Sequence, residues 1–258
     1  HLEGFGSAEG VKKGKKELFD YLRSTKNSDG SHKMSFVHGG HPVLLEVSEG
    51  MERTIFGTDQ EKPRVVFNGE GMKRQFMWDE DGYKSNPAPI QLEGDYNLDN
   101  IAAAIAVGRF FGVKRADVTA SLSNYVPTNN RSQTIKTEFN EILLDAYNAN
   151  PSSMEEALKS FALHKEHPRL AILGDMRELG THSMHSHSRI VELCHELALN
   201  AIFVGEAFGE ISQDKNTGRF FSSIEELISE IEGGKIKGEN ILLKGSRGMA
   251  MERLLPLL

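Results

Sequence analysis

Residues 141–151, EILLDAYNANP, carry a short apolar run that ends at an aspartate and leads into a proline-initiated helical pattern. The same rhythm returns three times in the second half of the chain: PRLAILGDM at 168–176, NAIFVGEA at 200–207 and NILLKGSRG at 240–248. Short apolar strands that alternate with helices are typical of a parallel sheet covered on both faces. The pattern therefore predicts an α/β fold with a mostly parallel sheet, and it leaves the strand order open.

The carboxyl ends of these strands are where function is expected. Ligands bind beyond the carboxyl ends of strands in open parallel sheets, and here those ends are Asp145, Asp175 and the turn 245–247. Helical patterns directly follow the first, second and fourth strands, at Ser152–Ala162, about Met184–Leu199, and Met249–Leu257.

The first half of the chain has a different texture. A basic helix is predicted over about Ser7–Arg23, Asp81–Gly82 is a hairpin signal, and a helix in YNLDNIAAAIAVGRFFGV (96–113) should end at Gly112. A shorter helix is predicted near 115–123. The polar, turn-rich stretch NYVPTNNRSQ, 124–133, marks a boundary, so we expect two domains, 1–126 and 127–258.

Composition narrows the classes of protein to consider. The 258 residues are 38% hydrophobic and 26% charged, as in ordinary soluble globular domains. The net charge of −7 argues against a broad basic face for nucleic acid, and no apolar run approaches the roughly 20 residues of a membrane span. The single cysteine, Cys194, fits a reducing cytoplasm; its amphipathic helical pattern favours a buried side chain over a nucleophile.

The glycine-rich opening, HLEGFGSAEGVKKGKKELF at 1–19, does not fit a standard phosphate loop. A dinucleotide fingerprint requires G-x-G-x-x-G after a strand, whereas the spacing here is G-x-G-x-x-x-G with only three residues before it. The G-x-x-x-x-G-K-[ST] string of a P-loop does not occur in this sequence. As a motif, the stretch predicts a glycine-rich helix entry with Ser7 as the N-cap.

Five stretches nevertheless resemble the Mur ligase family, in family order: the opening 1–19, GDYNLDNIAAAIAVG (94–108), LLDAYNANPSSMEEAL (143–158), LGDMRELG (173–180) and LLKGSRGMAMERLL (242–255). The resemblance spans nearly the whole chain. It implies that residues 1–126 correspond to the back part of a central ATPase domain, and residues 127–258 to a Rossmann-like third domain. It also implies that the family's P-loop lies upstream of His1, so we expect a fragment that is inactive alone.

Within the family, the motifs are most similar to the branch that joins D-alanyl-D-alanine to UDP-N-acetylmuramoyl-tripeptide. This resemblance implies ATP and Mg²⁺ as cofactors, an acyl phosphate on the tripeptide carboxylate, and attack by the dipeptide amine. It implies small-molecule partners, a monomer, and a cytoplasmic role in peptidoglycan precursor synthesis. Two alternatives stay open: another ATP-dependent ligase, such as a folylpolyglutamate-type enzyme, and a non-catalytic nucleotide-binding module.

In the first half, the resemblance assigns His1 to a magnesium ion and Lys15 to a carbamylated lysine that helps position the metal. Read alone, the lysine-rich stretch is a solvated helix face. GDYNLDN matches the family's G-x-H-N-x-x-N, with Tyr96 in place of the usual histidine. Asn97 and Asn100 lie one helical turn apart, and their carboxamides offer the donors and acceptors that an adenine edge requires. The alternative is that Asn97 only caps the helix.

Near the boundary, Arg131 matches a family arginine that reaches ATP, where a guanidinium can stabilise developing charge. The resemblance implies a hinge near residues 124–131. Asp145 matches the acidic residue that binds the ribose hydroxyls, and Tyr147 accompanies it at the nucleotide. Substrate contacts are expected from Asn148 and Asn150, together with Ser153. Residues 150–153 also read as an ordinary turn and helix start.

The remaining candidates follow the later strands. Asp175, Glu178 and His187 are expected to line the substrate cleft, with salt bridging as the alternative for the two acids. In KGSRG, backbone N–H groups with Lys244, Ser246 and Arg247 make a candidate anion site for a substrate carboxylate. A turn shaped only by its glycines is equally compatible. The spacings of His182, His185 and His187 suit no single helix face, which disfavours a metal site there.

Overall fold

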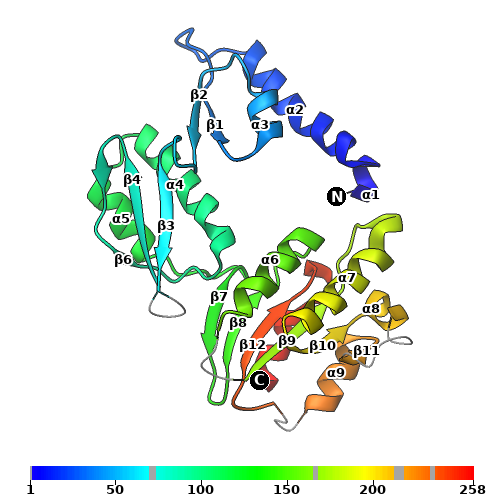
Figure 1. Cartoon of the computed structure of the whole chain (residues 1–258). Helices are drawn as coiled ribbons and strands as arrows, with labels where there is room; N and C mark the ends of the chain where they lie inside the picture. Colours follow the sequence, from blue (N-terminus) through cyan, green and yellow to red (C-terminus); the bar gives the residue numbers. More distant parts are fainter. Residues whose placement is uncertain (1, 70–73, 165–167, 212–217, 233–235) are drawn as a thin grey trace. The chain divides into compact units, whose positions relative to one another are not determined.

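The computed structural model describes residues 2–69, 74–164, 168–211, 218–232 and 236–258 (Figure 1). The chain divides into two compact units, His1–Ile90 with Asp95–Tyr125, and Gln91–Gly94 with Val126–Leu258. Among the described helices, none combines the length and the apolar character that a bilayer span requires.

The first unit combines helices with two small sheets. β1 (Ser35–His38) and β2 (Arg53–Phe56) pair in parallel, whereas β3 (Arg64–Asn68), β4 (Gln75–Glu80), β5 (Tyr83–Lys84) and β6 (Ala88–Pro89) form an antiparallel sheet. The helical elements are α1 (Leu2–Phe5), α2 (Ala8–Ser24), α3 (Pro42–Val47), the 3-10 turn η2 (Asp95–Asn97), α4 (Leu98–Phe110) and α5 (Arg115–Ser123).

The local predictions for this unit are confirmed. Ser7 Oγ accepts the Gly10 N–H at 3.0 Å and caps α2. Asp81 and Gly82 have φ values of 44° and 76°, the left-handed pair that a tight hairpin turn requires, and they join β4 to β5. α4 ends just before Gly112, whose φ of 82° suits a glycine C-cap.

The core of the first unit fixes the start of α4. Phe76 and Trp78, two residues apart in β4, both point to the buried face of the strand. Ile101 and Ile105 of α4 are buried to the same extent. The Trp78 indole N–H donates to Thr119 Oγ1 at 3.0 Å, which satisfies its single polar group. Because α4 packs on the neighbouring strand β3, its first turn is held in place by this core.

The second unit is a six-stranded sheet in the order β11-β10-β9-β12-β8-β7, in which only β7 runs antiparallel. The strands are β7 (Gln133–Lys136), β8 (Glu141–Asp145), β9 (Arg169–Gly174), β10 (Asn200–Val204), β11 (Arg219–Phe221) and β12 (Asn240–Lys244). The helical elements are α6 (Pro151–Phe161), η3 (Gly180–His182), α7 (Ser183–Glu196), α8 (Glu206–Ile211), α9 (Ile224–Ile231), η5 (Arg247–Met249) and η6 (Met251–Leu257). The predicted α/β fold with a mostly parallel sheet is confirmed.

Both faces of this sheet are covered, which explains why its central strands are apolar along most of their length. One face packs Ile142, Leu144 and Ile172 with residues of α9 and η6. Successive side chains of a strand point to opposite faces, and the other face lies under α6 and α7, which run across the same side of the sheet (Figure 1). Edges and strand ends are therefore where polar groups of this unit can gather.

The predicted α-helix over Met249–Leu257 is wrong in type. The segment instead forms the 3-10 turns η5 and η6, which meet at Ala250 with a left-handed φ of 51°. Pro256 lies inside η6 and has no N–H to give to a helical hydrogen bond. The strands β7 and β11 and the helix α8 are short and were not predicted. The helix α9 was missed although its apolar residues Ile224, Leu227, Ile228 and Ile231 recur at helical spacing.

Cys194 is fully buried on α7, as its sequence pattern predicts. Burial raises the pKa of the Cys194 thiol from 9.0 to about 12, because the thiolate loses its hydration. At pH 8 only about one thiol in ten thousand is then ionised. The native chain should therefore be inert to DTNB at pH 8, whereas the urea-unfolded chain should react promptly. Native and unfolded rates within tenfold of each other would contradict this.

Candidate functional site

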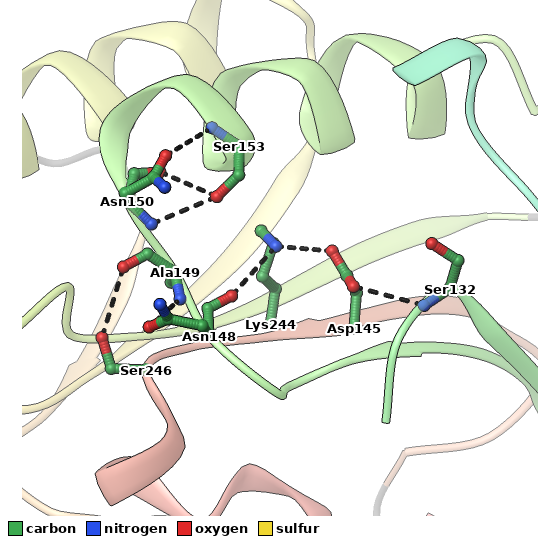
Figure 2. A network of polar contacts seen from close by, with 8 residues as sticks. All are labelled: Ser132, Asp145, Asn148, Ala149, Asn150, Ser153, Lys244 and Ser246. Atoms are coloured by element: carbon green, nitrogen blue, oxygen red, sulfur yellow. Dashed lines mark hydrogen bonds and ion pairs between the residues drawn. The ribbon is translucent and has the colours of Figure 1, made fainter. Parts of the chain in front are cut away.

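The loops that follow β8, β9 and β12 meet at one edge of the six-stranded sheet, because β12 lies between the other two strands and all three run in parallel. Lys244, the last residue of β12, is in register with Asp145, the last residue of β8. Figure 2 shows the polar contacts that join the loops after these two strands. Residues predicted from separate motifs therefore come together here.

Asp145 and Lys244 form a buried ion pair. Lys244 Nζ lies 2.5 Å from Asp145 Oδ2 and 3.4 Å from the Asn148 carbonyl oxygen, and its side chain is only 2% exposed. The other carboxylate oxygen, Asp145 Oδ1, accepts the Ser132 N–H at 3.2 Å. The groups expected to bind a ribose and a substrate carboxylate thus already have partners inside the chain. The Lys244 ammonium is thus engaged by a carboxylate and a carbonyl of the chain itself.

Arg131 is exposed on a tight turn beside this pair. Its neighbours Asn130 and Ser132 have left-handed φ values of 57° and 47°, which are uncommon for residues other than glycine. The Tyr147 N–H donates to the Asn130 carbonyl at 3.0 Å. The Arg131 guanidinium lies 3.7 Å from the centroid of the Tyr147 ring, a cation–π contact. Two residues expected at the nucleotide therefore lie together.

Asn150 and Ser153 form the N-terminal capping box of α6. Asn150 Oδ1 accepts the Ser153 N–H at 2.9 Å, and Ser153 Oγ accepts the Asn150 N–H at 3.1 Å (Figure 2). This is the helix-start role that the sequence left open beside substrate contact. Asn148 is exposed, and its Oδ1 accepts the N–H of the next residue at 2.9 Å.

Asp175, directly after β9, caps α8. Its Oδ2 accepts the Ala207 N–H at 3.0 Å and its Oδ1 accepts the Phe208 N–H at 3.1 Å. Gly205 allows this approach: its φ is 130°, and a Cβ atom there would overlap the carboxylate. The Asp175 carboxylate is therefore directed into the fold, toward backbone amides.

His187 is fully buried and supports the loop that follows β9. Its Nε2 accepts the Met176 N–H at 2.9 Å, so the proton sits on Nδ1, which donates to the Ser183 carbonyl at 2.8 Å. The ring packs edge-on against Phe208, with centroids 4.6 Å apart. His187 was expected to line the substrate cleft; the structure places it beneath the loop after β9, holding the loop's backbone.

Ser246 connects the three loops. Its N–H donates to the Asp175 carbonyl at 3.1 Å, its Oγ accepts the Arg177 N–H at 2.8 Å, and the same hydroxyl donates to the Ala149 carbonyl at 3.4 Å. Ser246 is only 3% exposed. Like Lys244, Ser246 is buried and bonds to other groups of the chain, and these bonds fix the loops at this edge.

Besides Arg131, this edge carries the exposed charges Arg247, Glu178 and Arg177. Arg247 pairs with Glu252 Oε1 at 2.8 Å, and Glu178 has a left-handed φ of 63°. Sequence reasoning missed Arg177, although its place two residues after Asp175 in LGDMRELG was a usable signal. Its guanidinium lies so close to Gly248 that a Cβ there would overlap Nη1.

In the first unit, Asn97 and Asn100 meet at the first turn of α4. Asn100 Nδ2 donates to Asn97 Oδ1 at 3.1 Å. Asn97 is buried and occupies the N-cap position, yet its side chain makes no capping hydrogen bond to the helix. The two carboxamides therefore form a joined pair, with Asn100 exposed.

Lys15 and Lys13 differ from the other two lysines of α2. Lys12 pairs with Glu46 at 2.9 Å and Lys16 with Asp20 at 2.7 Å, whereas Lys15 is exposed and has no ion-pair partner in the described part of the chain.

The expected magnesium site cannot be built from this structure. His1 lies outside the described residues, and the described ranges hold no group of three or more His, Cys, Asp or Glu residues that could bind a metal ion. Mg²⁺ prefers several oxygen ligands, so no role for it follows from the residues in place.

Comparison with known proteins agrees with the fold. Residues 130–247 match the family described as Mur ligase, glutamate ligase domain. The chain is 27% identical over 274 residues to UDP-N-acetylmuramoyl-tripeptide–D-alanyl-D-alanine ligase of Bacillus subtilis, and 29% identical over 266 residues to that of Escherichia coli. Each match covers 98% of this chain and 56% of the relative, so the chain spans just over half the length of these proteins.

Solved structures show the same fold. MurF from Acinetobacter baumannii superposes with a TM-score of 0.82 at 23% identity, covering 99% of this chain and 56% of that one. MurF from Thermotoga maritima in complex with ADP gives 0.82 at 20% identity, covering 100% and 58%. Residues 130–247 are thus a Mur ligase glutamate ligase domain, in a chain that is similar over 98% of its length to ligases of that kind.

Proposed function

We propose that this chain provides the third domain and part of the central domain of an ATP-dependent ligase that joins D-alanyl-D-alanine to UDP-N-acetylmuramoyl-tripeptide. The main support is that the loops DAYNANP, LGDMRELG and KGSRG meet at one edge of the sheet. The chain is also similar over 98% of its length to ligases of that name. A folylpolyglutamate-type enzyme has weaker support, with TM-scores of 0.60 and 0.68 at 11% and 14% identity for two folylpolyglutamate synthases.

The proposed reaction has two steps, and this chain's residues hold and neutralise the reactants. The tripeptide carboxylate takes the γ-phosphoryl group of ATP, and the dipeptide amine then displaces phosphate from the acyl phosphate. Arg131, held against Tyr147, neutralises charge on the phosphoryl group. Asn97 and Asn100 contact the adenine, and Lys15 is the amine available for carbamylation.

At the sheet edge, we divide the expected substrate residues into two groups by their exposure. Arg247, Glu178 and Asn148 are exposed and face the substrates, with Arg177 added to them. Five further residues act indirectly, by fixing loop backbones from within: Asp145, which was expected at the ribose, and Asp175, His187, Lys244 and Ser246. Asn150 is exposed, but its side chain caps α6. The proposal also includes a cytoplasmic location and a monomeric state.

Phosphate release from ATP tests this function. The assay uses the chain within its complete natural coding frame, with UDP-N-acetylmuramoyl-tripeptide and D-alanyl-D-alanine, and compares it with the 258-residue chain alone. We expect release only when both substrates are present, and at least a roughly 100-fold lower rate after Arg131→Ala. Release with a folate and glutamate instead would favour the alternative ligase. Nucleotide binding without any release would favour a binding module.

A further inference from the structure

Lys244 is placed where an anion-binding lysine was expected, but its ammonium faces inward. β12 and β8 run in parallel with Lys244 opposite Asp145, so both side chains leave the sheet on the same face. The ammonium folds onto its neighbour's carboxylate at 2.5 Å and onto the Asn148 carbonyl at 3.4 Å (Figure 2). The role of the Asp145–Lys244 pair therefore depends on the next contact of the Asp145 carboxylate.

The carboxylate continues the chain of contacts to Ser132. Asp145 Oδ1, the oxygen that does not face the ammonium, accepts the Ser132 N–H at 3.2 Å. Partial rotation about the Cβ–Cγ bond of Asp145 would turn Oδ1 away from the Ser132 N–H and break this contact. The ammonium on Oδ2 opposes that rotation, because a charge-assisted hydrogen bond is directional and strong in a buried place.

The turn that receives this contact needs support. Asn130 and Ser132 are both left-handed, a strained state that persists only where the surroundings hold it. The Tyr147 N–H holds the Asn130 carbonyl, and Asp145 holds the Ser132 N–H. Arg131 lies between these two anchored residues, with its guanidinium over the Tyr147 ring.

We propose that Lys244 is a positioning residue. It fixes the Asp145 carboxylate and, through the Ser132 N–H, the turn that presents Arg131. The importance of this for catalysis rests on the proposed function, in which Arg131 reaches the nucleotide. The positioning itself depends only on the second unit and can be measured without any substrate.

The test is NMR on the ¹⁵N-labelled 258-residue chain and its Lys244→Met variant. Two signals are followed: hydrogen exchange of the Ser132 amide relative to the Leu143 amide in β8, and the Arg131 Nε–Hε shift, which the Tyr147 ring moves upfield. Lys244→Met should speed the relative exchange of Ser132 about tenfold or more and remove the upfield shift. Arg247→Met, three residues away but exposed, should leave both signals unchanged.

A second variant guards against simple unfolding. Asp145→Asn/Lys244→Met leaves no buried charge at this site, so it should fold even where the single variant does not. It should still show about tenfold or faster relative exchange at Ser132, because nothing then fixes the new carboxamide at position 145. Native exchange and a native Arg131 signal in either folded variant would overturn the proposal, whatever the outcome of the ligase assay.

Discussion

Gly205→Ala should lower the free energy of unfolding of the second unit by about 3–9 kcal/mol, a large share of the roughly 5–15 kcal/mol typical of a domain. Two costs combine. An alanine at φ 130° is strained by about 1–3 kcal/mol. Its Cβ would also overlap the Asp175 carboxylate and displace it, leaving the Ala207 and Phe208 amides uncapped at about 1–3 kcal/mol each.

Gly209→Ala is the matched control for this prediction. Gly209 lies four residues later, inside α8, and a Cβ there would meet nothing within 4 Å. Alanine is the better helix former by about 0.5–1 kcal/mol, so this variant should be unchanged or slightly more stable. Urea unfolding followed by far-UV circular dichroism compares the two. If Gly205→Ala unfolds at the same urea concentration as Gly209→Ala, the Asp175–Gly205 contact does not stabilise the fold.

Local chemistry explains what the sequence could predict. The apolar strands, the Ser7 cap, the Asp81–Gly82 turn and the end of α4 each depend on residues close together in the chain. They were predicted correctly because helix caps, tight turns and strand burial have signatures of a few residues. Met249–Leu257 was wrong for a local reason as well: its apolar spacing suited an α-helix, while Pro256 and the left-handed Ala250 favour 3-10 turns.

The site could be located from the sequence, but its internal contacts could not be predicted. Strand ends indicated the edge at which the candidate residues meet, yet the cation that pairs with Asp145 is 99 residues away, and the pairing depends on β12 lying beside β8. Strand order is a tertiary property that apolar patterns do not encode. His187 shows the same limit, because its burial arises from Phe208 on a different helix. Family resemblance indicated candidate residues near the edge, whereas only the structure separates exposed groups from those that support them.

That separation predicts the second large effect, at the buried ion pair. Lys244→Met should lower the free energy of unfolding by about 3–5 kcal/mol, because it leaves the Asp145 carboxylate buried without its cation. The double variant Asp145→Asn/Lys244→Met should recover at least half of this loss. A buried pair replaced on both sides costs far less than a pair broken on one side, since its attraction is largely offset by desolvation.

Urea unfolding of the native chain, Asp145→Asn, Lys244→Met and the double variant gives the coupling energy between the two residues. Trp78, the single tryptophan, lies in the first unit, so its fluorescence reports unfolding of that unit. Circular dichroism reports both units, and comparing the two signals separates changes in the second unit. A double variant as unstable as the sum of the singles would mean that the two charges do not depend on each other. The double variant could regain stability and still leave the Arg131 turn disordered. That result would mean that the ion pair serves to position the turn and contributes little to stability.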